Sequence, residues 1–97
     1  MSDELVDIID FMDLVNFTLS DKFIEVWRHK FSEKFLKSFQ TKILEALSRQ
    51  KPIKLNSLFL ALQKNNKYSK SQIINFFDSI NIDIYRPLVN GNLKHVK

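Results

Sequence analysis

The sequence contains no cysteine, one glycine and two prolines among its 97 residues. The absence of cysteine excludes a disulfide framework, thiol catalysis and thiolate-rich metal sites, and it fits a reducing compartment. With one glycine there is no glycine-rich phosphate-binding loop. No apolar run approaches the ~18 to 20 residues that span a bilayer, and the acidic start Met-Ser-Asp-Glu is unlike a signal peptide. We therefore expect a soluble protein, intracellular in the cytoplasm or nucleus, without membrane contact.

Acidic residues are also scarce in the C-terminal half. Residues 46–97 contain only Asp78 and Asp83 against nine Lys or Arg, whereas residues 1–21 contain six acids and no base. The two segments therefore carry net charges of +7 and −6. Such a split indicates one part that faces a polyanion and another that avoids or mimics one. The alternative is two solvated faces of opposite sign.

No pattern of catalytic or metal-binding residues is present. His29 and His95 are far apart, and neither has a set of ligands spaced around it. The acids Asp3, Asp7 and Asp10 share one face of a predicted helix, which rarely makes a cation site without ligands from elsewhere. No serine stands in a nucleophile elbow. We expect a protein that is not an enzyme and has no cofactor, metal or small-molecule substrate.

The N-terminal part, residues 1–40, is predicted to form helices. Apolar residues between Leu5 and Val15 follow helical spacing, so a helix is expected from Ser2, its N-cap, to about Phe17. Thr18 and Asp21 resemble a capping box that starts the next helix. A ladder with a large apolar residue at every fourth position then follows: Phe23, Trp27, Phe31, Phe35, Phe39, Ile43 and Leu47. Because each step turns about 40° past a revolution, the helix either breaks, most plausibly near Gln40-Thr41, or has neighbours on several sides.

The aromatic ladder has two interpretations. Helical spacing favours packing in the interior, and it also allows a contact with a second copy or another protein. The apolar face of the first helix is wider than one neighbour covers, which favours a further surface against it. The residues predicted for such an interface are Phe11, Phe17, Phe23, Trp27, Phe31 and Phe35.

Residues 41–97 show a different order of elements. A helix over 41–50 ends before Lys51-Pro52, since proline disfavours the α region at the preceding residue. Residues 53–55 alternate as in a short strand, and Asn56 is predicted to cap a helix that runs to about Lys64. After a turn at 65–67, Ser69 and Gln72 form a capping box for a last helix with Ile73, Phe76, Phe77 and Ile80 as its buried stripe.

The single glycine, Gly91, stands in an Asn-Gly pair between two runs that contain apolar residues. This pair is typical of a tight hairpin with a type I′ turn. A terminal β-hairpin is therefore predicted over residues 82–96, with Pro87 restricting its first strand to an edge or delaying its start.

In this order the elements resemble the winged helix-turn-helix superfamily, with Lys54-Leu55, residues 69–81 and residues 89–92 as anchors. The resemblance covers about 57 residues and implies that the third helix enters the DNA major groove while the hairpin acts as the wing. Two features depart from it: the connection from Lys64 to Tyr68 is long, and Asp78 lies on the face that would approach phosphates. On this basis the nucleic-acid-binding residues are expected to be Lys64, Lys67, Lys70, Ser71, Asn75, Arg86, Lys94 and Lys97.

The expected architecture is a single, mainly α-helical domain, with an N-terminal helical pair packed on a winged-helix-like module over 41–97 with a C-terminal β-hairpin. The first functional hypothesis is a small regulator or accessory factor of transcription or replication that binds double-stranded DNA, as a homodimer or with a protein partner. The second is a protein-protein interaction subunit, or an inhibitor, that does not bind DNA. The acidic helix is either a mask for the basic face or a docking element.

Overall fold

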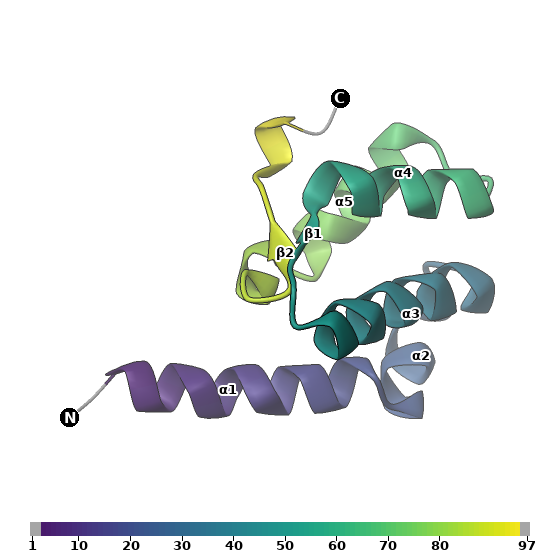
Figure 1. Ribbon diagram of the computed structural model, residues 1–97. Helices are drawn as coiled ribbons and strands as arrows, with labels where there is room; N and C mark the ends of the chain where they lie inside the picture. The colour runs from purple at the N-terminus through teal and green to yellow at the C-terminus, as the bar shows by residue number, and fades with distance from the viewer. Residues whose placement is uncertain (1–2, 96–97) are drawn as a thin grey trace.

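The protein folds into five α-helices and short additional elements, as shown by a computed structural model that describes the backbone of residues 3–95 and the side chains of residues 11–94. The elements described are α1 (Asp3–Thr18), α2 (Asp21–Trp27), α3 (Glu33–Arg49), β1 (Ile53–Lys54), α4 (Leu55–Asn65), α5 (Lys70–Ser79), the 3₁₀ helix η1 (Ile82–Tyr85), β2 (Val89–Asn90) and the 3₁₀ helix η2 (Leu93–His95). In Figure 1, α3 lies between the α1–α2 pair and α4. The predicted mainly helical fold is confirmed.

The aromatic ladder is divided between two helices. The chain leaves the helical path after Trp27, and α3 begins at Glu33 because the Ser32 side chain accepts a hydrogen bond from the Phe35 amide. The predicted break near Gln40-Thr41 is wrong, since α3 continues through both residues. The Gln40 amide instead donates to the carbonyls of Thr18 and Ser20, at 2.7 and 3.1 Å. A polar side chain here ties α3 to the segment between α1 and α2 and leaves the helix intact.

The core is built around the rings of α3 and α5. The Phe76 ring of α5 packs edge-on against Phe35 and Phe39 of α3, with centroids 4.9 and 5.1 Å apart. Phe23 of α2 stacks on Phe39 at 5.9 Å. Interior packing is therefore the correct interpretation for Phe23, Phe35 and Phe39, which are at most 1% exposed.

The start of α2 differs from the prediction. The N-cap is Ser20, and no side chain caps this helix. Thr18 is fully buried, and its hydroxyl donates to the Leu14 carbonyl at 2.7 Å and lies 2.8 Å from the Tyr85 hydroxyl. The predicted capping box of Thr18 with Asp21 is wrong, because this hydroxyl is used to join α1 to η1.

The helices α4 and α5 form as the local signals indicate. Ser69 accepts from the Gln72 amide while the Gln72 side chain accepts from the Ser69 amide, which completes the capping box. Ile73, Phe76, Phe77 and Ile80 are buried, as predicted. Asn56 does not cap α4: the helix begins at Leu55, because Lys54, already extended by strand pairing, occupies the N-cap position.

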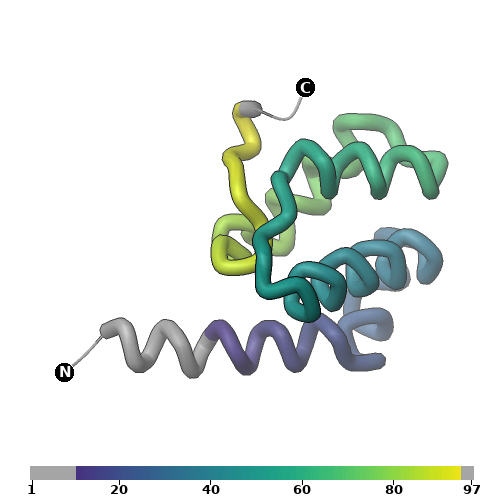
Figure 2. The backbone as a smooth tube through the Cα atoms, in the orientation of Figure 1, coloured from purple at the N-terminus to yellow at the C-terminus, as the bar shows by residue number. Residues whose placement is uncertain are grey.

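The predicted C-terminal β-hairpin does not form among the described residues. Val89–Asn90 instead pairs in parallel with Ile53–Lys54, and the chain beyond Gly91 enters η2. The yellow C-terminal segment runs beside the teal β1 in Figure 2. Asn90 does not adopt the positive φ that a type I′ turn requires, and the Ile53 amide donates to the Leu88 carbonyl at 2.9 Å. Pairing with a distant strand thus replaces the local turn.

Candidate nucleic-acid interface

The outward face of α5 is the first part of the candidate interface. The capping box fixes the start of this helix, and the buried stripe fixes its rotation, so the remaining side chains face solvent. Lys70, Ser71 and Asn75 are exposed there, as predicted, together with Asp78 and Ser79. The Ser71 hydroxyl lies 3.2 Å from that of Ser69, and the Ser79 hydroxyl donates to the Asn75 carbonyl. The face therefore offers one cation, one amide and hydroxyl groups, with one acid beside them.

Lysines also gather where α4 turns into α5. A groove of about 520 Å³ is lined there by Lys64 and Lys67, by Lys34 from the first turn of α3, and by four neutral residues: Ser32, Asn65, Asn66 and Tyr68. The Asn66 side chain donates to the Leu62 carbonyl at 3.0 Å, and the Tyr68 hydroxyl accepts from the Ser32 amide at 2.7 Å. The first bond ties the connection to the end of α4, and the second holds it against the start of α3. The structure thus joins two predicted lysines to Lys34, which was not predicted.

The predicted wing residues lie elsewhere. Arg86 follows η1 and Lys94 lies in η2, so both flank β2, which pairs with β1 at the start of α4. Lys64 lies at the opposite end of α4 from this strand pair. Because α4 has 11 residues, it separates the two places by about 16 Å. Because no hairpin forms in the described segment, Arg86 and Lys94 do not line a wing, which corrects the prediction. Lys97 lies outside the described residues.

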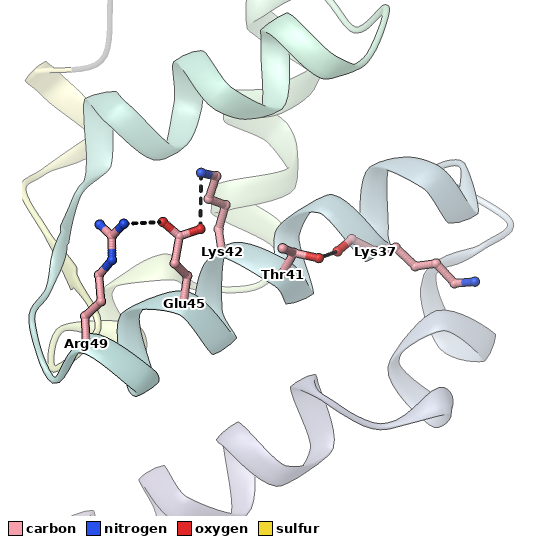
Figure 3. Close-up of polar contacts among 5 residues, drawn as sticks. All are labelled: Lys37, Thr41, Lys42, Glu45 and Arg49. Atoms are coloured by element: carbon pink, nitrogen blue, oxygen red, sulfur yellow. Dashed lines mark hydrogen bonds and ion pairs between the residues drawn. The ribbon is translucent and has the colours of Figure 1, made fainter.

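A second basic groove lies at the other end of α3. Its volume is about 330 Å³, and its lining includes Lys42, Glu45, Arg49, Lys51 and Lys54. Figure 3 shows Glu45 between two cations: its carboxylate lies 3.5 Å from Lys42 Nζ and 3.5 Å from Arg49 Nη2. Lys42 and Glu45 are about one-third exposed, while Arg49 is 70% exposed. The carboxylate therefore orders two cations at the edge of a groove with further lysines.

Sequence reasoning missed the contribution of α3 to both grooves. Lys34, Lys42 and Arg49 follow one another at steps of eight and seven residues, which places them on one side of a helix. That spacing was readable, but the aromatic ladder dominates the same segment. The association of Lys34 with Lys64 comes from packing between α3 and α4, which no local pattern contains.

The predicted interface residues are found in three environments. Phe23 and Phe35 are buried in the protein's own core, so they present no surface to a partner, and this part of the prediction is wrong. Phe11, Trp27 and Phe31 are partly buried against the core, and Phe17 is 38% exposed. Met12, also on α1, is 49% exposed. Any partner of this region would therefore contact Phe17 and its neighbours on α1.

The described residues contain neither a metal-binding cluster nor a membrane-spanning helix. No group of three or more His, Cys, Asp or Glu residues in that part of the chain is placed to hold a metal ion. Within the same part, no helix has the length and apolar character needed to cross a membrane.

Comparisons with protein-family models, with curated proteins and with solved structures find no match to this chain. The resemblance to winged helix-turn-helix proteins therefore stays a prediction that rests on the order of elements.

Proposed function

We propose that this protein binds double-stranded DNA through α4 and α5, as a small intracellular regulator or accessory factor of transcription or replication. The observation that carries the proposal is the outward face of α5, where Lys70, Ser71 and Asn75 are exposed on a helix whose start and rotation are fixed. Lys64 in the last turn of α4 and Lys67 in the connection lie just before this helix. In this respect α4 and α5 resemble the helix-turn-helix part of a winged helix.

The chemistry of this face suits a duplex. Lys70 and Ser71, in the first turn of α5, are groups that contact phosphate and so position a protein on DNA. Asn75, one turn further along, can pair with the N6 and N7 atoms of adenine in the major groove. Asp78 repels phosphate at the far end of the helix, which favours an approach by the N-terminal half of α5.

A salt titration of a labelled random duplex tests the proposal. Lys70→Glu should weaken binding at low salt and should reduce the steepness of log K against log salt by about 1 or more, since a phosphate contact is lost. Lys22→Glu is the matched control, because Lys22 is exposed on α2 and its substitution changes the net charge equally. Equal losses in the two variants, or no binding by the wild-type protein at low salt, would end the proposal.

The alternative function is a protein-protein interaction subunit or inhibitor that does not bind DNA. It is supported by the exposure of Met12 and Phe17 on α1. Capture from a lysate with and without nuclease separates the two functions. A protein partner that remains after nuclease treatment, together with no affinity for duplex, would favour the alternative.

A further inference from the structure

The two basic grooves lie at opposite ends of the contact between α3 and α4. A third hollow of about 130 Å³ lies between them and is lined by residues of both helices. It shares Asn65 with the groove at the α4–α5 connection and Lys42 with the groove beside Glu45. We call this row of three hollows the α3–α4 seam. Between Lys34 and Arg49 it follows about 22 Å of α3, at 1.5 Å per residue.

The seam is lined almost entirely by one sign of charge. Lys34, Lys64 and Lys67 lie at one end, and Lys42, Arg49, Lys51 and Lys54 lie at the other. Among the described lining residues of the three hollows, the only acid is Glu45. A groove lined by one sign of charge concentrates the field and attracts counter-ions of opposite sign.

Most of these cations have no carboxylate of their own. Ion pairs join Glu45 to Lys42 and to Arg49. Among the described residues no carboxylate lies within ion-pair distance of Lys34, Lys51, Lys54, Lys64 or Lys67. An incoming anion therefore meets five lysines that have no ion-pair partner among the side chains of residues 11–94.

We propose that the α3–α4 seam binds the sugar-phosphate backbone of a single nucleic-acid strand. The three hollows, of about 130 to 520 Å³, follow one another along α3, so their seven cations form a row and not a single cluster. Repeated cations along a groove are the means by which proteins follow a single strand without reading its sequence. This site extends the proposed function: it shares Lys64 and Lys67 with the proposed duplex interface, but its other cations lie outside α5 and can be tested by different variants.

The neutral lining residues favour nucleic acid over an acidic peptide. Six of the seven cations are lysines, which act as point charges toward phosphate, and Arg49 adds a planar fork that can pair with one phosphate through two hydrogen bonds. Ser57, Asn65 and Asn66 add neutral groups of the kind that contact phosphate and sugar. The Tyr68 ring, fixed 4.6 Å from that of Phe35, supplies an aromatic group for base stacking at one end.

The test is a fluorescence-anisotropy titration of the full chain with labelled oligothymidine over a range of salt. Lys34→Glu and Lys54→Glu, one at each end of the seam, should each lower affinity several-fold and reduce the salt slope by about 0.7 for the lost contact. Lys22→Glu is the control of equal charge, and Lys70→Glu tests the α5 face. Neither of these two should alter binding of the single strand beyond the small effect of net charge.

Glu45→Gln should change the affinity for the strand in the opposite direction. Loss of the carboxylate releases Lys42 and Arg49 toward the ligand, so the affinity for oligothymidine should rise several-fold and the salt slope should become steeper. Thermal unfolding of each variant shows that it is folded. Because a damaged fold lowers affinity, a gain in Glu45→Gln cannot come from unfolding.

Several outcomes would overturn the proposal. The first is that the folded wild-type protein does not bind oligothymidine at low salt. The second is that Lys22→Glu and Lys54→Glu lose the same amount of affinity for the strand. The third is that polyglutamate at the same charge concentration displaces the strand. Loss of single-strand binding in Lys70→Glu alone would also overturn it. Duplex binding that is lost in Lys70→Glu and kept in Lys54→Glu would leave the proposed function intact while the seam fails.

Discussion

Tyr85 joins two distant parts of the chain through one buried hydroxyl. The side chain is 1% exposed, and its oxygen lies 2.8 Å from Thr18 Oγ1. Because the Thr18 hydroxyl already donates its only proton to the Leu14 carbonyl, Tyr85 must donate to Thr18. The bond therefore fixes the end of α1 against η1. Neither residue carries a sequence signal for this role.

We predict that Thr18→Val destabilises the protein more than Tyr85→Phe does. Valine leaves the buried Tyr85 hydroxyl without an acceptor, which costs about 1 to 3 kcal/mol, whereas phenylalanine removes the donor and costs about 1 kcal/mol. Urea unfolding of both variants measures the difference. The reverse order would contradict the assignment of Tyr85 as the donor.

The same hydroxyl predicts a pH dependence. Burial raises the pKa of Tyr85 above its ordinary value of 10.0, because the charged phenolate is poorly solvated in the core. The unfolded state then loses its proton first, so the contribution of Tyr85 to stability is complete below pH 10 and falls as the pH rises toward the folded pKa.

Unfolding free energies of the wild type and of Tyr85→Phe should therefore be compared from pH 8 upward. The advantage of the wild type should be constant below pH 10 and should shrink above it. The comparison cancels the contributions of all other residues, which the two proteins share. An advantage that does not change above pH 10 would show that Tyr85 ionises equally in both states.

At the scale of elements, Gly91 is required by a close approach between segments. Its φ is +130°, and a Cβ at this position would lie 3.1 Å from the Cβ of Leu55, the first residue of α4. The sequence signal at Asn90-Gly91 correctly marks a position that needs glycine. The need arises from the contact with α4 and the backbone angle, and not from the predicted hairpin turn.

Gly91→Ala should lower the unfolding free energy by about 1 to 3 kcal/mol, because the backbone of an alanine is strained at this φ even where there is room for its methyl group. Asn90→Ala, at the exposed neighbouring position in β2, is the matched control and should change stability little. Chemical denaturation measures both. Equal effects would mean that Gly91 tolerates a side chain.

The capping box of α5 gives a second prediction at this scale. Ser69→Ala removes the acceptor for the Gln72 amide and should cost about 1 kcal/mol. Ser71→Ala, two residues further into the helix, should have a smaller effect on thermal unfolding. If the two variants had the same unfolding temperature, the cap would not determine where α5 begins.

The features that sequence predicts here are those set by neighbouring residues. The Ser69 capping box, the end of α3 before Pro52 and the strand at residues 53–54 each depend on groups a few positions apart. The pairing of β1 with β2 depends on how α4 and α5, which separate the two strands in the sequence, pack together. No local pattern contains that packing, so the Asn90-Gly91 pair predicts a hairpin.

The candidate site divides in the same way. The exposed face of α5 follows from its buried stripe, so spacing alone predicts that Lys70, Ser71 and Asn75 face solvent, and they are exposed. The seam requires α3 beside α4, which brings Lys34 to Lys64 across 30 positions of sequence. Helical spacing can suggest that Lys34, Lys42 and Arg49 share a side, but it does not supply the opposite wall.

At the scale of the whole molecule, cations gather on two surfaces. The α5 face offers Lys70 at the start of the helix and Asp78 near its end, whereas the α3–α4 seam is lined by seven cations and one acid. If both surfaces bind nucleic acid, the molecule can hold a duplex and an adjoining single strand together. Such a combination suits an accessory factor that acts where duplex is opened.

The most direct test of nucleic-acid binding is the affinity of the unmodified wild-type protein for labelled single-stranded and duplex DNA between 50 and 200 mM salt, the range over which phosphate contacts change affinity most visibly. We expect binding of both at the lower concentration, with log K falling linearly against log salt and a slope of about −0.7 per single-strand contact. Absence of binding at the lower concentration, or an affinity that salt does not change, would contradict the account.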